Sequence, residues 1–313
     1  MTSVVIAAYN EEAVIGRCLD ALLADAPPDP LDPLDITVVA NGCTDATAAV
    51  ARERAGVRVL DLPGAGKAAA LNAGDATAVG FPRVYLDADV VLSPGALRAF
   101  GAALDRSVDG RGGDPPLAVV PGRSLDLTGR PTPVRAYYAI NSRLPAFRHS
   151  LFGRGAIALS AAGRARFDTF PAMTADDLFL DGLFAPYEKR ELDGVLARLA
   201  TPRRTGDLVR RLVRVRAGNA ELRAAAARGA VATVAVRRTA RSSWLRDVVL
   251  PRPWLAPAAA CYVGITLVAA LRAQRELRAG SGGWGRDESS REPALADAES
   301  DGQPPSGLVK HSR

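Results

Sequence analysis

Residues 85–91 of the chain read Tyr-Leu-Asp-Ala-Asp-Val-Val, and this stretch decides the fold class. The apolar residues that precede Asp87 are typical of a buried strand, and Ser93-Pro94 is typical of a helix start. Two carboxylates directly after a buried strand need a partner, and a divalent cation that also binds phosphate oxygens is the obvious one. The alternative is a solvated pair of loop acids, because Asp-x-Asp alone is a short pattern.

The chain before this stretch alternates strands and helices. Strands rich in apolar residues are predicted at residues 3–8, 36–40, 57–60 and 84–86. Helical patterns of apolar residues and helix-start signals predict helices at residues 11–23 and 67–78, and a helix that is capped by Thr44-Asp45 and runs through residue 55. Such alternation is typical of a parallel sheet that is covered on both faces and binds ligands at the carboxyl ends of its strands.

A polar signature follows each of the four predicted strands. In chain order they are Tyr9-Asn10-Glu11, Asn41-Gly42, Gly-Ala-Gly-Lys at residues 64–67, and Asp87-Ala88-Asp89. The third is not a P-loop, because the first glycine of that motif would fall at Asp61 and Ala68 replaces the hydroxyl residue that holds Mg²⁺. Four signatures at one edge of a sheet predict a binding site there.

Four segments together resemble the ordered motifs of glycosyltransferase family 2. They are residues 7–12 (Ala-Ala-Tyr-Asn-Glu-Glu), 41–47 (Asn-Gly-Cys-Thr-Asp-Ala-Thr), 66–74 (Gly-Lys-Ala-Ala-Ala-Leu-Asn-Ala-Gly) and 86–89 (Leu-Asp-Ala-Asp). The resemblance is close over residues 2–95 and continues more loosely to about residue 219. It implies the GT-A fold, a three-layer α/β/α sandwich around a mostly parallel sheet. It also implies sugar transfer from a nucleotide-diphosphate donor with inversion at the anomeric carbon, assisted by Mg²⁺ or Mn²⁺.

The resemblance assigns most of the donor site to the amino-terminal half. It implies that Tyr9, with Ala8 before it, lies against the nucleotide base and that Glu11 is near the ribose. It makes Asp89 the more direct metal ligand, while Asp87 would contact the ribose or, through water, the metal. As alternatives, Tyr9 could pack on the edge of the sheet, and Glu11 could be a first-turn acid favoured by the helix dipole.

Two further positions bear on the donor. Asn41 departs from the Asp-Gly-Ser that the family usually carries here. Its amide oxygen can still accept a hydrogen bond from the base, but without charge assistance, which leaves the nucleotide open. Lys67, near a helix start, could complement the diphosphate or could be an ordinary solvated lysine. Asp45 is predicted to cap a helix rather than bind a ligand.

The acceptor side is predicted in the second half of the chain. Residues 153–160 resemble the strand beneath the acceptor pocket of the family, and residues 174–180 (Thr-Ala-Asp-Asp-Leu-Phe-Leu) resemble its Glu-Asp-x-x-Leu element. The resemblance therefore makes Asp177 the catalytic base, with Asp176 in the place of the Glu. An attacking hydroxyl must lose its proton, and a carboxylate withdrawn from water has a raised pKa that suits this task. The alternative is a two-acid cap on a helix that runs to Phe184.

Arg211 and Arg214 fall where processive members of the family carry Gln-x-x-Arg-Trp. Arg211 stands for the Gln and Val215 for the Trp, so the sequence predicts a non-processive enzyme. Either arginine could neutralise the leaving diphosphate, or both could belong to a basic helix face.

Composition favours a reducing compartment. The chain of 313 residues has a net charge of +6, two histidines, and three cysteines whose spacings do not form a disulfide framework. The first residues enter a strand at once, so no signal peptide is expected. The sequence thus predicts a cytoplasmic protein.

An apolar stretch at residues 254–271 has about the minimum length for a membrane span and follows an arginine-rich region at residues 203–252. Three interpretations stay open: a helix or short hairpin on the membrane surface, a true span, and a buried core helix. The basic region would favour anionic headgroups, and its few aromatic residues argue against nucleic-acid binding. Attachment to the cytoplasmic face of the membrane would fit a lipid-linked hydroxyl acceptor and a cell-envelope glycan product.

The predicted organisation has four parts. They are a nucleotide-sugar-binding half at residues 1–110, the acceptor-binding half of the same domain at 111–225, a helical membrane-associating extension at 226–279, and a disordered tail at 280–313. Two other functions stay open. A nucleotidyltransferase of the same general fold is disfavoured by the Asp176-Asp177 element, whereas the departure at Asn41 leaves room for a catalytically silent nucleotide-binding module at the membrane.

Overall fold

The computed structural model describes residues 1–24, 33–64, 66–105, 115–148, 150–173, 175–231, 240 and 242–279. The tail predicted at residues 280–313 lies outside these ranges. The boundary predicted at residue 110, between the two halves of the catalytic domain, and the boundary predicted at residue 225, before the helical extension, stay predictions.

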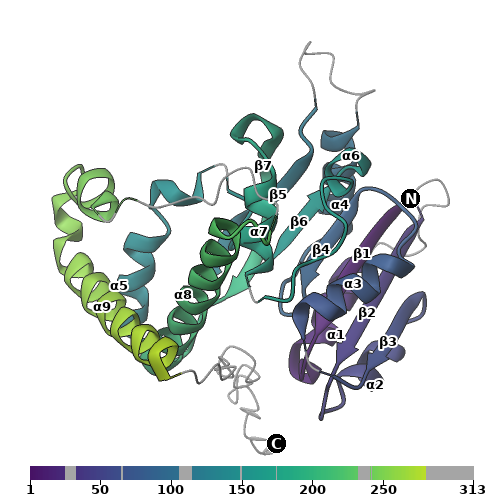
Figure 1. Cartoon of the computed structure of the whole chain (residues 1–313), viewed down its shortest axis with the longest axis horizontal. Helices are drawn as coiled ribbons and strands as arrows, with labels where there is room; N and C mark the ends of the chain where they lie inside the picture. Colours follow the sequence, from purple (N-terminus) through teal and green to yellow (C-terminus); the bar gives the residue numbers. More distant parts are fainter. Residues whose placement is uncertain are drawn as a thin grey trace, which may run out of the picture.

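A seven-stranded sheet forms the centre of the molecule (Figure 1). Its strands in chain order are β1 (Thr2–Ala8), β2 (Leu34–Asn41), β3 (Val57–Leu62), β4 (Arg83–Asp87), β5 (Ala118–Asp126), β6 (Ala156–Leu159) and β7 (Lys189–Ala200). The strand order is β3-β2-β1-β4-β6-β5-β7, and β6 runs antiparallel to both of its neighbours while the other pairs are parallel. The predicted mostly parallel sheet is confirmed.

Nine helices accompany the sheet in the described residues. They are α1 (Glu12–Leu22), α2 (Thr47–Arg52), α3 (Lys67–Thr77), α4 (Pro94–Leu104), α5 (Thr132–Asn141), α6 (Ala161–Arg164), α7 (Asp176–Leu183), α8 (Thr205–Ala227) and α9 (Ala256–Ala279). Short helical turns occur at Pro145–Phe147, Pro186–Glu188, Trp244–Val249 and Pro253–Leu255. The start of α4 follows from its sequence, because the Ser93 hydroxyl accepts the N–H of Ala96 at 3.3 Å and Pro94 fits the first turn.

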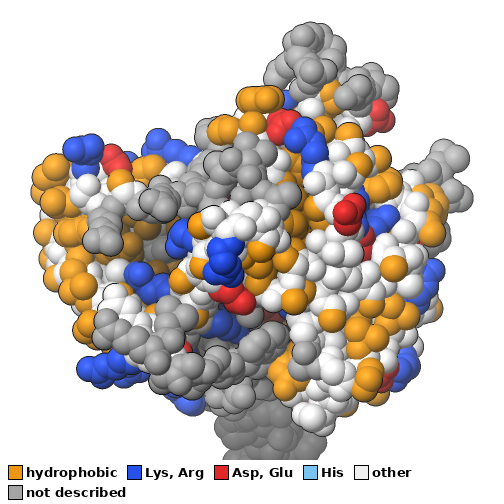
Figure 2. Space-filling view, viewed as in Figure 1, with side chains coloured by type: hydrophobic (Ala, Val, Ile, Leu, Met, Phe, Trp, Pro, Cys, Tyr) orange, Lys and Arg blue, Asp and Glu red, His pale blue; other side chains and the backbone are white. Residues whose placement is uncertain are grey.

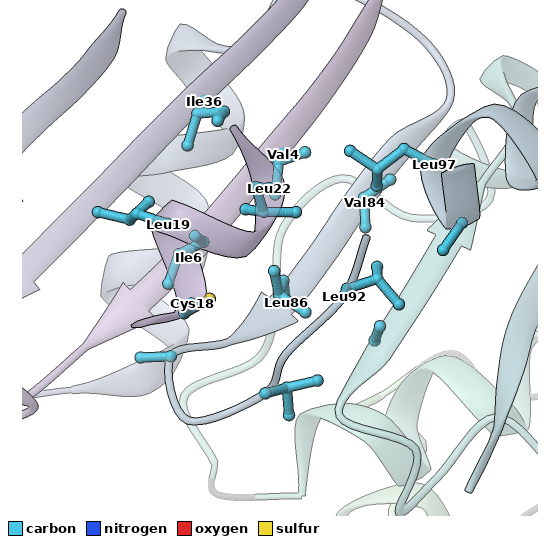
Figure 3. Packing of buried hydrophobic residues seen from close by; sticks show 14 of the residues in the cluster. Val4, Ile6, Cys18, Leu19, Leu22, Ile36, Val84, Leu86, Leu92 and Leu97 are labelled. Atoms are coloured by element: carbon cyan, nitrogen blue, oxygen red, sulfur yellow. The ribbon is translucent and has the colours of Figure 1, made fainter. Parts of the chain in front are cut away.

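Two hydrophobic clusters, one on each face of the sheet, complete the three layers. The first packs Val4 and Ile6 of β1 against Leu19 of α1 and Leu97 of α4 (Figure 3). The second joins the opposite face to α3 and α7. There α3 approaches β1 so closely that a Cβ on Gly74 would lie 2.5 Å from Val5 Cγ1. Each large apolar side chain buried in this way stabilises the fold by about 1.5–3 kcal/mol.

Asp75, at the end of α3, is the centre of a buried ion-pair network. Its carboxylate binds the guanidinium groups of Arg83 and Arg164 and accepts the hydroxyl of Tyr85 at 2.8 Å. The Asp75 and Arg83 side chains are only 7% and 6% exposed. The network ties α3 to β4 and to α6, on the side of the sheet that carries α7.

We expect Asp75→Asn to lower the free energy of unfolding by about 3–5 kcal/mol, because it leaves two largely buried guanidinium groups without their carboxylate. Asp61→Asn is the matched control, because the side chains of Asp61 and Arg52 are each 54% exposed. Such an exposed ion pair contributes under about 1 kcal/mol to the free energy of unfolding. Urea denaturation of the three proteins measures the difference. Equal losses for the two variants would contradict this account of the network.

The stabilisation that this network gives to the fold is expected to decrease in acid. Burial works to raise the pKa of Asp75, but Arg164, Tyr85 and Arg83 outweigh it, and the pKa lies below its usual value. The stabilisation is therefore complete above the unfolded pKa of about 3.9 and disappears as the pH falls through the folded value. The difference between wild type and Asp75→Asn should shrink in acid.

The helices α5, α8 and α9 lie side by side beyond one edge of the sheet (Figure 1). Ile265, Ala269 and Ala273 of α9 pack against Tyr137 of α5 and Val213 of α8. The hairpin interpretation of the apolar stretch is wrong, because α9 is one continuous helix. Its proline, Pro257, lies in the first turn, where the missing N–H costs no helical hydrogen bond.

Candidate active site

A pocket of about 260 Å³ opens at the carboxyl ends of β1, β2 and β4, and residues of α8 form its opposite wall. Its lining consists of Ala7, Tyr9, Glu11, Asn41, Lys67, Asp87, Ala88, Asp89, Gly153, Gly155, Ala175, Asp176, Asp177, Leu199, Ala200, Arg211, Arg214, Val215, Gly218 and Asn219. Every residue predicted for the site therefore lines one pocket except Ala8. That side chain is buried in β1, and its neighbour Ala7 lines the pocket instead.

Lys67 connects the two halves of the pocket. Its Nζ lies 2.9 Å from Asp87 Oδ1 and 3.0 Å from Asp176 Oδ2, so one ammonium group joins the end of β4 to the start of α7. Burial works to lower the pKa of Lys67, but the carboxylates of Asp176 and Asp87 outweigh it, and the pKa is raised. Lys67 is thus a paired cation rather than a solvated side chain.

Asp177 is fixed by the backbone. Its Oδ2 accepts the N–H of Gly153 at 2.9 Å, and its Oδ1 accepts the N–H of Leu178 at 2.7 Å. Burial raises the pKa of this carboxyl, although Lys67 and the N–H of Gly153 oppose the shift. Burial also raises the pKa of Asp176, to about 6, against the opposing charge of Lys67. The pKa of the predicted base is therefore shifted upward, the direction that favours proton acceptance.

Asn41 holds together three segments of the pocket floor. Its Nδ2 donates to the carbonyl of Ala8 at 2.8 Å, and its Oδ1 accepts the N–H of Gly66 at 2.7 Å. A carboxylate could not make the first bond, because it has no proton to donate. This double role gives a structural reason for an amide at a position where the family usually has an acid.

The loop after β1 and the loop after β2, which lie where the nucleotide base is expected to bind, are joined by hydrogen bonds. The side chain of Asn10, a residue with a positive φ of 51°, pairs with the backbone and hydroxyl of Thr44 at 2.8 and 3.1 Å. Asp45 accepts the N–H of Thr47 at 3.0 Å in the turn before α2, but the N-cap residue of α2 is Ala46 and no side chain among the described residues caps the helix, so the capping role expected of Asp45 is wrong. The helix begins at Thr47 and ends at Arg52, before the expected end at Ala55.

Sequence reasoning missed the glycines of the Gly153-Arg154-Gly155 turn. Gly155 has a φ of 70°, and a Cβ there would lie 2.4 Å from Val90 Cγ2. Gly153, with a φ of 68°, donates the N–H that fixes Asp177. Two glycines around one residue before a predicted strand were the signal for a tight turn at the pocket.

The charges of the pocket fit a hard divalent cation. The lining holds five carboxylates, from Glu11, Asp87, Asp89, Asp176 and Asp177, and three cationic side chains. Among the residues that the structure describes, no group of three or more His, Cys, Asp or Glu could hold a metal by itself. Mg²⁺ and Mn²⁺ accept one or two carboxylates when substrate phosphates and water complete the ligands, so Asp87 and Asp89 are a sufficient protein contribution.

Residues 3–123 match the family model described as glycosyl transferase family 2. This region of the chain belongs to that family. The match covers β1 to β4 and most of β5, and with them the pocket residues from Ala7 to Asp89. The chain is accordingly a glycosyltransferase.

Solved structures resemble the glycosyltransferase over most of its length. The mannosyltransferase PcManGT from Pyrobaculum calidifontis, in complex with GDP-Man and Mn²⁺, aligns with 21% identity and a TM-score of 0.54 over 89% of this chain and 79% of that chain. S. aureus TarS 1-349 with UDP-GlcNAc aligns with 16% identity and a TM-score of 0.49, over 89% and 92% of the two chains. Glucosyl-3-phosphoglycerate synthase from Mycobacterium tuberculosis, with Mn²⁺, UDP and glucosyl-3-phosphoglycerate, aligns with 23% identity and a TM-score of 0.45, over 70% and 78%. The comparison with curated proteins finds no match.

Proposed function

We propose that the chain transfers a sugar from a nucleotide-diphosphate donor to a hydroxyl acceptor, non-processively and with inversion at the anomeric carbon. The observation that carries this proposal is the ion pairing of Lys67, which brings Asp87 and Asp176 into one pocket. The mannosyltransferase of similar fold was solved with a nucleotide sugar and Mn²⁺, which supports the same donor class here.

The donor half would bind the nucleotide and its diphosphate. Tyr9 offers an aromatic face to the base, and Glu11 offers a carboxylate to the ribose. Asp89, with Asp87, would hold Mg²⁺ or Mn²⁺, which supplies positive charge to the leaving diphosphate when it is bound. Arg211 and Arg214 of α8, on the opposite wall, would add to that charge.

Asp177 would act as the base. Its carboxylate accepts the proton of the acceptor hydroxyl while the oxygen attacks the anomeric carbon from the face opposite the diphosphate. The two backbone N–H groups that bind Asp177 hold it in place before the substrate arrives. Asp176 would act through Lys67, which it keeps between the two halves of the pocket.

The donor class is tested by thermal denaturation in the presence of nucleotide sugars, with and without Mn²⁺. We expect one nucleotide sugar to raise the Tm in a metal-dependent manner. Stabilisation by a nucleoside triphosphate alone would favour the nucleotidyltransferase. Nucleotide-sugar binding without any transfer would favour the catalytically silent module.

We also infer that α9 lies on the cytoplasmic face of a membrane and that the acceptor is lipid-linked. The outer face of α9 and the turn before it expose Trp254, Leu267, Val268 and Leu271, with exposures between 42% and 72%. Figure 2 shows apolar side chains along this edge of the molecule, with basic side chains at both ends of it. The exposed arginines near it include Arg246, Arg252, Arg272 and Arg275. An apolar face flanked by cations fits an anionic membrane surface.

The stretch Pro253–Glu276 is the one helical segment in the described part of the chain with the length and composition to cross a membrane, at a mean hydropathy of 1.8. Only 17% of its apolar window is buried within the protein, so it is not a fully buried core helix. Its inner face packs on α5 and α8, which supports attachment along the surface rather than a free span.

We expect the double variant Leu267→Glu and Leu271→Glu to lose at least tenfold of its binding to vesicles that contain phosphatidylglycerol, because two charges enter the apolar face. Co-sedimentation measures the bound fraction. The control is Val79→Glu, at an exposed apolar residue remote from α9 in the fold. Equal binding of the double variant and wild type would contradict surface attachment, and extraction only by detergent would favour a span.

A further inference from the structure

A group of charged and aromatic side chains lies beside the predicted base, outside the donor half. Arg123 comes from β5, Arg154 from the turn before β6, and Glu191 from β7. The Arg154 side chain is 3% exposed and makes two hydrogen bonds to the carboxylate of Glu191, at 2.8 and 2.7 Å. Arg154 also binds the carbonyl of Phe147, and its buried Nε has no hydrogen-bond partner among the described residues. We call Arg123, Phe147, Arg154 and Glu191 the arginine cluster.

Arg123 does not line the pocket itself but lies beside Gly153, which does. Its guanidinium carbon lies 3.7 Å from the centre of the Phe147 ring, a stacked cation–π contact that holds the group in one orientation. Its Nη1 lies 3.9 Å from the point where a Cβ on Gly153 would be. Gly153 lines the pocket and donates its N–H to the predicted base Asp177. One glycine therefore separates Arg123 from the group that would accept the proton of the acceptor.

The cluster carries more positive than negative charge. The charged groups that act most strongly on Arg123 are Arg154, Glu191 and Arg211. Glu191, the carboxylate of this set, is already engaged by both terminal nitrogens of Arg154. Burial, followed by the charge of Arg154, lowers the pKa of Arg123 to about 10, so it remains a cation at neutral pH. An anion is the ligand that such a set of guanidinium groups recognises.

We propose that the arginine cluster, through Arg123, binds an anionic group of the sugar acceptor, so that the acceptor is a hydroxyl compound carrying a phosphate or a carboxylate. This inference rests on the proposed glycosyltransfer. A guanidinium group can donate two parallel hydrogen bonds to either anion, and the contact with Phe147 helps to hold the group in place. Gly153 donates its N–H to Asp177 and lies beside the guanidinium group of Arg123. The anionic group of the acceptor and its attacking hydroxyl would therefore be close together in the acceptor molecule.

The test measures anion binding, which does not require turnover. Inorganic phosphate is titrated by calorimetry into wild type, Arg123→Gln, Arg214→Gln and Arg135→Gln, the last being an exposed arginine on α5. We expect Arg123→Gln to weaken phosphate binding by about tenfold to hundredfold, as for the loss of a hydrogen bond to a charged group. Arg135→Gln should bind as wild type does, whereas Arg214→Gln reports any phosphate that binds at the donor wall instead. Arg123→Lys, which keeps the charge without the fork, should give an intermediate loss and guards against misfolding of the glutamine variant.

Two further probes identify the source of the anion. Tighter binding of octyl phosphate than of inorganic phosphate would indicate a lipid phosphate, and tighter binding of glycerate would indicate a carboxylate. The proposal is overturned if phosphate fails to bind wild type, or if its binding is lost in Arg214→Gln and kept in Arg123→Gln, which assigns the anion to the donor site. Failure of the glycosyltransfer proposal would be seen separately, as the absence of any nucleotide-sugar binding by the folded wild type.

Discussion

Asp177→Asn is expected to lower the rate of sugar transfer by about 10²- to 10⁴-fold, the usual contribution of a general base. The amide has nearly the shape of the carboxylate but cannot accept the proton of the attacking hydroxyl. Donor affinity should stay within about twofold of wild type, because Asp177 would face the acceptor rather than the nucleotide. Steady-state rates and calorimetric donor binding, measured on the same preparations, give the two quantities.

The pH profile gives a second readout of the same residue. Burial raises the pKa of Asp177 above the usual carboxyl value, and the base works only when it is ionised. The rate should therefore fall as the pH is lowered through that raised value, and the residual activity of Asp177→Asn should lack this acidic limb. Asp193→Asn, at an exposed position on β7, is the matched control. A transfer rate in Asp177→Asn within a few fold of wild type would remove Asp177 from the mechanism.

Asp89→Ala is expected to abolish the metal-dependent binding of the donor. A ligand present at a hundred times its Kd stabilises the native protein by about 2.7 kcal/mol. In wild type, this stabilisation by the nucleotide sugar should require Mn²⁺ or Mg²⁺. In Asp89→Ala, the addition of metal should produce no further rise in Tm, because the carboxylate that would bind the ion is gone.

The matched control for this variant is Asp61→Ala, which removes an exposed carboxylate at the end of β3 without entering the pocket. The Asp61→Ala protein should keep the full metal-dependent shift. If the Asp89→Ala protein keeps it as well, the metal is held by other groups, and the assignment taken from the Asp-x-Asp pattern is wrong.

The amino-terminal half of the fold was readable from the sequence because its signals are local. The first four strands are short segments rich in apolar residues, and the polar segments that follow them all reach the same edge of the sheet. The topology alone therefore predicts that Tyr9, Asn41, Lys67 and Asp87 gather at one site. The helix expected to run through Ala55 ends earlier, at Arg52, and it begins at Thr47 after a turn in which Asp45 accepts the N–H of Thr47.

The contacts that organise the site could not be predicted from the sequence, because they join residues far apart in the chain. Nothing in the sequence near Lys67 indicates that its ammonium group pairs with Asp176 as well as Asp87. Arg123 and Arg154 are two arginines among many in a basic chain, and only the neighbouring strands β5 and β6 bring them together. The expectation of a hairpin was wrong because Pro257 lies in the first turn of α9, where a proline does not break a helix.

The most direct test of the whole account is the release of nucleoside diphosphate from nucleotide sugars by the purified protein. The account predicts release from one nucleotide sugar, dependent on Mn²⁺ or Mg²⁺ and reduced by about 10²-fold or more in Asp177→Asn. If the folded protein releases no nucleoside diphosphate from any nucleotide sugar, and instead releases pyrophosphate from a nucleoside triphosphate, the account of sugar transfer is contradicted.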